Sequence, residues 1–174
     1  MTARADPRVK PLPDNSHRIL GVTIDNPSVV RYHPDVEREI DVAIYDLVEA
    51  NSFEPDAVFF GGAPHGPYNV TLRIQDTRLI FDIDREDGVK IGAVMFSVQP
   101  FRRTIREYFT VCESYYEAIR SASPAQIEAI DVGRRALHNE GSERLRAQLA
   151  GKVEIDFDTA RRLFTLICAL HIRA

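Results

Sequence analysis

The chain has 174 residues, of which 44% are hydrophobic and 28% charged, and its formal net charge is −4. These values are typical of one soluble domain with its own core, and an acidic chain without a lysine-rich run argues against a nucleic-acid partner. No stretch approaches the roughly 20 apolar residues that cross a bilayer, and the first 17 residues lack an apolar signal segment, so we expect a cytoplasmic protein without membrane contact.

The folded part of the chain is expected to start near Arg18. Residues 1–17 are polar, interrupted by prolines and without a hydrophobic period, which favours a disordered lead-in ahead of a single domain at 18–174. The apolar residues of RILGVTID then predict a short strand. Pro34 is well suited to be the first residue of a helix, whose apolar positions recur at helical spacing up to about Ala50.

The middle of the chain has the pattern of an antiparallel meander. The glycine- and proline-rich segment FFGGAPHGPYN, residues 59–69, is expected to be a loop. Apolar and polar residues then alternate in 70–74 and again in 79–83, with a turn between them, which is typical of a hairpin. Asp87-Gly88 predicts a second turn before another apolar run, so residues 68–98 are expected to form three antiparallel strands.

The rest of the chain is predicted to be mainly helical. One helix begins at Pro100. A second follows the capping signal Ser123-Pro124-Ala125-Gln126 and is expected to end at Asn139 or Glu140, just before Gly141. Ser142 is then expected to cap a short continuation that runs to Leu149.

The last helix is expected to be central to the fold. A brief extended piece at 153–155 precedes it, Asp156 or Asp158 caps it, and its apolar residues surround it almost completely. Together these elements predict a single α+β domain, in which an antiparallel β-meander packs against a C-terminal helical cluster.

Four runs in the second half of the chain resemble a known family. PFRRTIREYF, CESYYEAIR, QIEAIDVGRRALHNEGSERL and IDFDTARRLFTLICALH are similar to the bacterial uncharacterised protein family (UPF) 0262. The resemblance covers about residues 18–173 and is strongest from Pro100 onward. It implies a small cytoplasmic bacterial protein, and it carries over no activity and no catalytic residue.

Three arginine pairs stand out in the basic second half, where residues 101–174 hold 12 Lys and Arg against 10 Asp and Glu. Arg102-Arg103 and Arg161-Arg162 fall in the opening turn of predicted helices, and Arg134-Arg135 lies within one. The start of a helix already carries a partial positive charge, so an arginine there costs about 0.3–1 kcal/mol unless an anion lies nearby. We therefore expect a negative group at those helix starts, from the protein's own carboxylates or from an external ligand.

Arg134 and His138 are expected to point into the fold, because they project between apolar positions of their helix. A partly buried Arg134 needs either a carboxylate partner, such as Asp131 three residues earlier, or a bound anion. Both alternatives stay open. With Tyr116 as a possible ring contact, the candidate anion site comprises Arg102, Arg103, Tyr116, Arg134, His138, Arg161 and Arg162.

The sequence predicts no metal site, no cofactor and no catalytic nucleophile. His138 and Glu140 lie about 200° apart around a helix, whereas two metal ligands on one helix are usually three or four residues apart. Cys112 and Cys168 fall on apolar helical surfaces, which predicts packing residues without a disulfide bond.

Functions from different classes are compatible with these features. The first hypothesis is a non-enzymatic interaction or regulatory module with a protein partner or in a homo-oligomer, because the sequence lacks a catalytic set. The alternative is a binder of a small phosphorylated or carboxylated ligand, held by the arginine pairs. The third is a hydrolase or transferase acting on a phosphorylated metabolite, with His138 as base and Glu140 or Asp158 as its partner.

Overall fold

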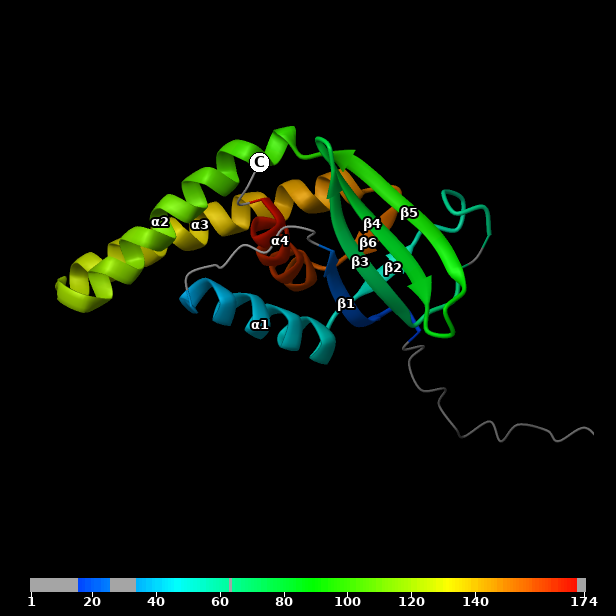
Figure 1. Cartoon of the computed structure of the whole chain (residues 1–174), viewed down its shortest axis with the longest axis horizontal. Helices are drawn as coiled ribbons and strands as arrows, with labels where there is room; N and C mark the ends of the chain where they lie inside the picture. Colours follow the sequence, from blue (N-terminus) through cyan, green and yellow to red (C-terminus); the bar gives the residue numbers. More distant parts are fainter. Residues whose placement is uncertain (1–15, 26–33, 63, 172–174) are drawn as a thin grey trace, which may run out of the picture.

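The computed structural model describes residues 16–25, 34–62 and 64–171. A sheet lies at one end of the molecule, and the helices extend from one of its faces (Figure 1). The predicted α+β class is confirmed. The elements in chain order are β1 (Ile19–Asp25), α1 (Pro34–Glu49), β2 (Phe53–Pro55), β3 (Tyr68–Gln75), β4 (Arg78–Arg85), β5 (Lys90–Ser97), the 3₁₀ turn η1 (Gln99–Phe101), α2 (Arg102–Ser121), α3 (Pro124–Leu149), β6 (Val153–Ile155) and α4 (Phe157–His171).

The larger sheet has the strand order β1-β3-β4-β5. The predicted antiparallel meander of β3, β4 and β5 is confirmed, with Leu72 opposite Phe81 and Phe81 opposite Val94. The sheet as a whole is mixed, because β1 pairs with β3 in parallel and α1 lies between them in the sequence. The expected extended piece at 153–155 is a strand, and it pairs with β2, a strand that the sequence pattern does not predict.

One side chain joins the end of α1 to the edge of the sheet. The backbone N–H of Ile19 donates to Asn51 Oδ1 at 2.7 Å, and Asn51 Nδ2 donates to the carbonyls of Ile19 at 2.9 Å and Leu47 at 2.7 Å. These bonds satisfy backbone groups of β1 and of the last turn of α1, which would otherwise lack partners. Asn51 therefore holds α1 in a fixed position beside β1.

The third helix differs from the prediction. Its capping box is confirmed, because Ser123 Oγ accepts from Gln126 N and the Gln126 side chain accepts from Ser123 N. The predicted break at Gly141 is wrong, since α3 continues without interruption to Leu149. Ser142 caps nothing, and its hydroxyl donates to the His138 carbonyl at 2.7 Å within the same helix.

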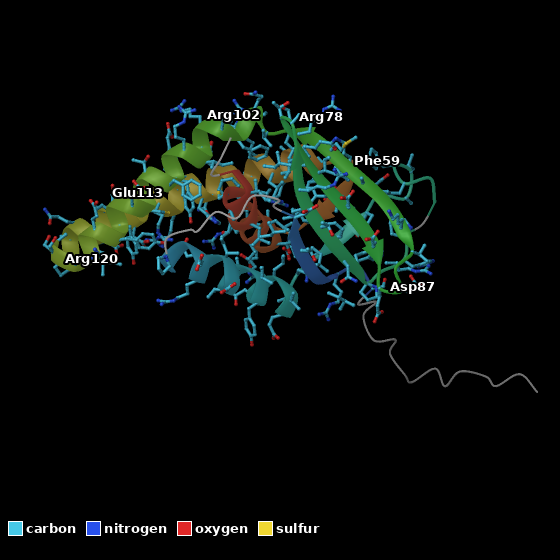
Figure 2. All side chains as sticks on the ribbon, viewed as in Figure 1. Phe59, Arg78, Asp87, Arg102, Glu113 and Arg120 are labelled. Atoms are coloured by element: carbon cyan, nitrogen blue, oxygen red, sulfur yellow. The ribbon has the colours of Figure 1, made fainter. Side chains whose placement is uncertain are left out.

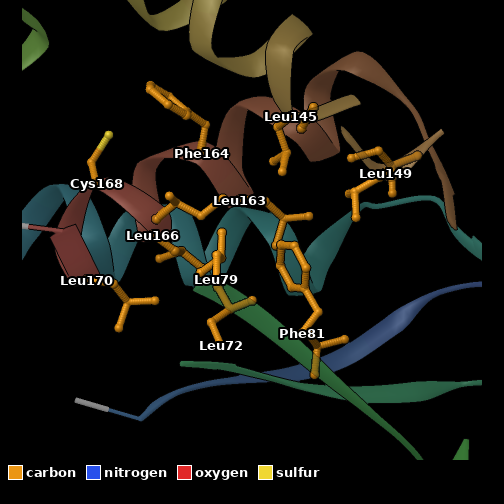
Figure 3. Packing of buried hydrophobic residues seen from close by; sticks show 14 of the residues in the cluster. Leu72, Leu79, Phe81, Leu145, Leu149, Leu163, Phe164, Leu166, Cys168 and Leu170 are labelled. Carbon is orange, nitrogen blue, oxygen red and sulfur yellow. The ribbon is translucent and has the colours of Figure 1, made fainter. Parts of the chain in front are cut away.

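Helix α4 is the centre of the core, as its apolar composition predicts. It packs against α1, α3 and the sheet, and its residues from Leu163 onward meet Leu72, Leu79 and Phe81 of the strands (Figure 3). The largest fully buried side chains come from every layer of the fold: Tyr68, Phe53, Phe81, Phe101, Phe164, Ile19, Leu47, Leu72, Leu79, Ile80, Ile83 and Leu145. Burial of this apolar surface is the main source of stability.

The predicted lead-in at 1–17 lies mostly outside the described residues. Within them, the His17 carbonyl accepts from Phe53 N at 3.0 Å, and the next carbonyl, of Arg18, accepts from Tyr68 N at 2.9 Å. The predicted boundary of the domain at residue 18 stays a prediction.

Candidate functional site

A cavity of about 690 Å³ lies among the four α-helices. In Figure 1 these are α1 below, the long α2–α3 hairpin above and α4 between them. The lining residues come from all four helices: Arg38, Glu39, Val42, Ala43 and Asp46 of α1, Tyr108, Tyr116, Ile119 and Arg120 of α2, Arg134, Arg135 and His138 of α3, and Asp158, Arg161, Arg162 and Thr165 of α4. A cavity of this size fits a small organic ligand.

The lining of this cavity is strongly basic. It holds six arginines and three carboxylates, although the chain as a whole has a net charge of −4. Positive charge is therefore concentrated where the helices meet, and the low-dielectric walls of a cavity strengthen its field.

The structure brings five of the seven predicted site residues together. The cavity is lined by Tyr116, Arg134, His138, Arg161 and Arg162. This agrees with the predicted inward direction of Arg134 and His138.

The other two predicted residues lie elsewhere. Arg102 is at the first turn of α2, close to the sheet, whereas Arg120 of the cavity is in the last turn of the same helix, near the hairpin tip (Figure 2). A helix of 20 residues is about 30 Å long, so the two ends do not serve one small ligand. Arg103 is 87% exposed, and its Nε donates to Glu107 Oε1 at 2.8 Å.

Arg134 has carboxylate partners of the protein's own. Its Nη2 lies 2.7 Å from Asp131 Oδ1, its Nη1 lies 3.8 Å from Glu39 Oε1, and its guanidinium lies 4.9 Å from the centre of the Tyr115 ring. The Arg134 hydrogen bond lowers the pKa of Asp131 and keeps that carboxylate charged. Tyr116 Oη donates to Glu39 Oε1 at 2.8 Å and extends the network to α2. Arg134 therefore links α3 to α1 through Glu39 and, through Tyr116, to α2. Of the two alternatives for Arg134, a carboxylate partner or a bound anion, this is the first.

His138 forms the floor of the cavity in an uncharged state. It is buried between the rings of Tyr108 and Phe164, with centroids 5.4 Å away in both cases. Desolvation, and then repulsion by Arg161 and Arg134, lowers the pKa of His138 to about 4. Its Nε2 lies 2.8 Å from Thr165 Oγ1, with no hydrogen bond to Glu140 or Asp158.

The proton on His138 follows from the hydrogen bonds of Thr165. The Thr165 hydroxyl donates to the Arg161 carbonyl at 3.2 Å, so its oxygen accepts from His138 Nε2–H. His138 Nδ1 is then an unprotonated acceptor, and it has no partner among the described residues.

Arg161 and Arg162 lie one turn further into their helix than predicted. They are the fifth and sixth residues of α4, whose start is capped by Asp156 Oδ1 accepting from Thr159 N at 2.8 Å. Arg162 Nη1 donates to the Ala50 carbonyl at 2.9 Å, at the end of α1. Within the described part of the chain, neither guanidinium has a carboxylate within 4.0 Å.

Two further arginines of the cavity were not predicted as site residues, and they too lack an acidic partner among the described residues. Arg38 and Arg120 form no ion pair in the described ranges, whereas Arg135 lies 3.2 Å from Asp131 Oδ2 and 3.6 Å from Glu128 Oε1. Arg38, Val42 and Asp46 are spaced four residues apart and so lie on one face of α1. This spacing is the only feature of the sequence that indicates that Arg38 faces the cavity.

The surroundings of both cysteines disfavour the thiolate form. Cys112 and Cys168 are free and buried, as predicted, and burial raises the pKa of the Cys112 thiol to about 11 and that of Cys168 as well. No group of three His, Cys, Asp or Glu side chains suited to a metal ion occurs among the described residues. Nor does any helix there have the length and apolarity to span a membrane.

Comparison with known proteins identifies the family to which this α+β domain belongs. The sequence profile of the uncharacterised protein family UPF0262 matches residues 16–173, so the chain belongs to this family. A UPF0262 protein of Rhodopseudomonas palustris (strain HaA2) is 54% identical over 162 residues, which cover 92% of this chain and 96% of that protein. A UPF0262 protein of Brucella canis is 55% identical over 156 residues, covering 90% and 94%. No solved structure matches.

Proposed function

We propose that this protein binds a small anionic ligand in the cavity among its four helices. The observation that carries the proposal is the gathering of six arginines around one cavity, three of which, Arg38, Arg120 and Arg161, have no hydrogen bond or ion pair from their side chains within the described residues. Phosphate and carboxylate oxygens are the groups that guanidinium donors pair with most strongly.

The cavity supports binding better than catalysis. His138 is the only histidine among the described residues that line the cavity, and the other titratable groups there are carboxylates, tyrosines and arginines. With a pKa of about 4 its imidazole is a weak base, and because Nε2 carries the proton that Thr165 accepts, only the buried Nδ1 is left to take up a proton. The side chains that line the cavity therefore give no support to the hydrolase or transferase hypothesis.

The experiment that tests the proposal is thermal unfolding with increasing inorganic phosphate, compared with chloride at equal ionic strength. A ligand at about 100 times its Kd adds about 2.7 kcal/mol to the free energy of unfolding, which is a shift of several degrees for a domain of this size. We expect the phosphate shift to fall in Arg161→Ala and Arg120→Ala.

The matched control is Arg106→Ala, because Arg106 is exposed on the same helix as Arg120 and lies outside the cavity. Each ligand shift is compared with the same variant in chloride, since removing one of several like charges alters the melting temperature by itself. Equal shifts in all four proteins, or no shift in the wild type, would contradict the proposal.

An interaction module is the second candidate, and one feature favours it. Val42, Tyr45 and Ile119 are large apolar side chains that are exposed, and two of them line the rim of the cavity. Exposed apolar groups beside arginines suit an acidic protein partner or a second copy of the chain. Sedimentation velocity of the wild type and of Tyr45→Asp tests self-association, and a wild type that stays monomeric at all concentrations excludes it.

A further inference from the structure

Two nitrogen atoms of residues that line the cavity are buried without a hydrogen-bond partner among the described residues. They are Nδ1 of His138, a residue that is 9% exposed, and Nε of Arg161. Buried polar groups are nearly always paired, so each unpaired one needs an explanation. Nδ1 is an acceptor, and the Nε–H group is a donor. A molecule that has both a hydroxyl and a negatively charged oxygen therefore suits this pair of atoms.

Hydrogen bonds to Thr165 place the two side chains in one small region between α3 and α4. His138 Nε2 donates to Thr165 Oγ1 at 2.8 Å, and the Thr165 hydroxyl donates to the Arg161 carbonyl at 3.2 Å. Arg161 thus lies one turn before the residue that holds the imidazole ring. Its charge lowers the pKa of His138 by more than that of Arg134, which is one turn before His138 on α3. Such an effect requires a guanidinium close to the imidazole.

His138 Nδ1 stays an acceptor at neutral pH. The rings of Tyr108 and Phe164 flank the imidazole, with centroids 5.4 Å away in both cases, and its pKa of about 4 keeps it uncharged. Because Nε2 carries the proton of the ring, Nδ1 presents a lone pair. This lone pair repels a charged oxygen without a proton, whereas a hydroxyl forms a hydrogen bond with it.

Hydrogen phosphate is a small anion with both kinds of oxygen. We propose that the cavity selects inorganic phosphate, whose P–OH group donates to His138 Nδ1 while a P–O⁻ oxygen accepts from the Arg161 guanidinium. Inorganic phosphate keeps at least one P–OH group at neutral pH, whereas sulfate has the same tetrahedral shape and no hydroxyl. The proton stays on the phosphate, so His138 determines specificity and does not act as a base. This inference rests on the proposed function, because it names the anion that the same cavity takes.

Arg161 is the side chain that can move to admit the anion. Solvent does not reach either of the two nitrogens in this structure. Arg161 is partly buried, and within the described residues its side chain forms no hydrogen bond or ion pair. A change of its rotamer therefore breaks no such contact, unlike a change at Arg134, which binds Asp131 and Glu39. We expect the Arg161 side chain to turn toward phosphate as it binds.

The test compares anions by isothermal titration calorimetry at pH 7.5 and constant ionic strength. We expect the Kd of phosphate to be at least about tenfold lower than that of sulfate, because a site that bonds a hydroxyl leaves its own polar group unpaired when the hydroxyl is absent. Arsenate, which also keeps a hydroxyl at this pH, should bind like phosphate. Methyl phosphate separates free phosphate from a phosphate monoester. Its second pKa is about 6, so at pH 7.5 it mostly lacks a P–OH group and should bind as weakly as sulfate.

His138→Gln removes the acceptor and keeps the donor, since its side-chain amide still reaches Thr165. The affinity for phosphate should fall to that for sulfate, and the affinity for sulfate should stay unchanged. A merely structural role of His138 would instead weaken both anions alike. His65→Gln is the matched control, because His65 is exposed and does not line the cavity. It should change neither affinity.

The wild-type protein supplies a readout that needs no variant. The nitrogen NMR signal of His138 Nδ1 should move upfield when phosphate binds, because an unprotonated imidazole nitrogen becomes more shielded when it accepts a hydrogen bond. Sulfate should leave this signal in place. An Nδ1 signal that already has the position of a protonated nitrogen before any anion is added would overturn the assigned roles.

Each failure concerns a different claim. If phosphate and sulfate bind equally, and Arg161→Ala weakens both, the inference is overturned and the proposed function stands. A preference for phosphate that persists in His138→Gln would assign the selection to other groups and would also overturn the inference. If none of these anions binds, both the inference and the proposed function fail.

Discussion

The ring of Phe164 in α4 occupies the space that a side chain at Gly141 of α3 would need. A Cβ built on Gly141 would lie 2.2 Å from Phe164 Cζ, far below any real contact distance. This close approach of the two helices also brings His138, one turn earlier on α3, within 2.8 Å of Thr165, one residue after Phe164. The floor of the cavity thus depends on a glycine that does not itself line the cavity.

Gly141→Ala is expected to destabilise the protein by about 1–3 kcal/mol, because the methyl group forces α3 and α4 apart. Gly133→Ala on the same helix is the matched control. An added Cβ there meets nothing within 4 Å, so helix propensity alone should stabilise the protein by about 0.5–1 kcal/mol. Urea unfolding of both variants measures the difference, and equal effects would contradict the close packing.

Because of His138, the free energy of unfolding is expected to decrease as the pH is lowered. Its folded-state pKa is about 4, below the ordinary 6.5, so between pH 6.5 and 4 the unfolded chain binds a proton that the native state does not. The free energy of unfolding is therefore unaffected by His138 above pH 6.5, and it falls by up to about 3 kcal/mol as the pH approaches 4.

His138→Gln removes this titration, while its side-chain amide can still donate to Thr165. We expect the loss of unfolding free energy between pH 6.5 and 4 to be smaller in this variant than in the wild type. A variant that loses as much stability as the wild type over this range would show that other groups cause the acid sensitivity.

Arg134→Ala is expected to destabilise the native state by about 1–3 kcal/mol without any ligand, because it leaves Asp131 and Glu39 without their main cationic partner. Arg134 is only 25% exposed, whereas Arg135 is 52% exposed. Arg135→Ala should therefore change stability by less than about 1 kcal/mol. Chemical unfolding in phosphate-free buffer compares them, and a stable Arg134→Ala would mean that the network contributes nothing.

Local patterns predicted much of the fold. Alternating apolar residues indicated β3 and β4, and Ser123 with Gln126 marked the start of α3. The period of α3 also predicted that His138 points inward, as its burial shows. Each of these signals lies within one element, where geometry fixes which side chains share a face.

Other features depend on residues far apart in the chain. Gly141 looked like a helix end, but its partner Phe164 is 23 residues further on and visible only in the packed structure. Glu39 contacts Arg134 across 95 residues, and the parallel pairing of β1 with β3 spans a whole helix. No periodicity within one element contains this information.

The arginine pairs illustrate both cases. Their positions on α2, α3 and α4 could be read from the sequence, and Arg134, Arg161 and Arg162 do meet at one cavity. Arg102 was grouped with them because helix starts attract anions in general, but the length of α2 separates it from the others. Which of the predicted arginines reach the cavity therefore depends on the direction in which each helix runs through the fold.

The measurement that tests anion binding in the cavity most directly is an NMR titration of the arginine Nε–Hε signals with inorganic phosphate at constant ionic strength. We predict saturable shifts of the Arg120 and Arg161 signals, and no saturable shift of the Arg106 signal. Small shifts that are uniform across all arginines and equal to those produced by chloride would contradict the proposal.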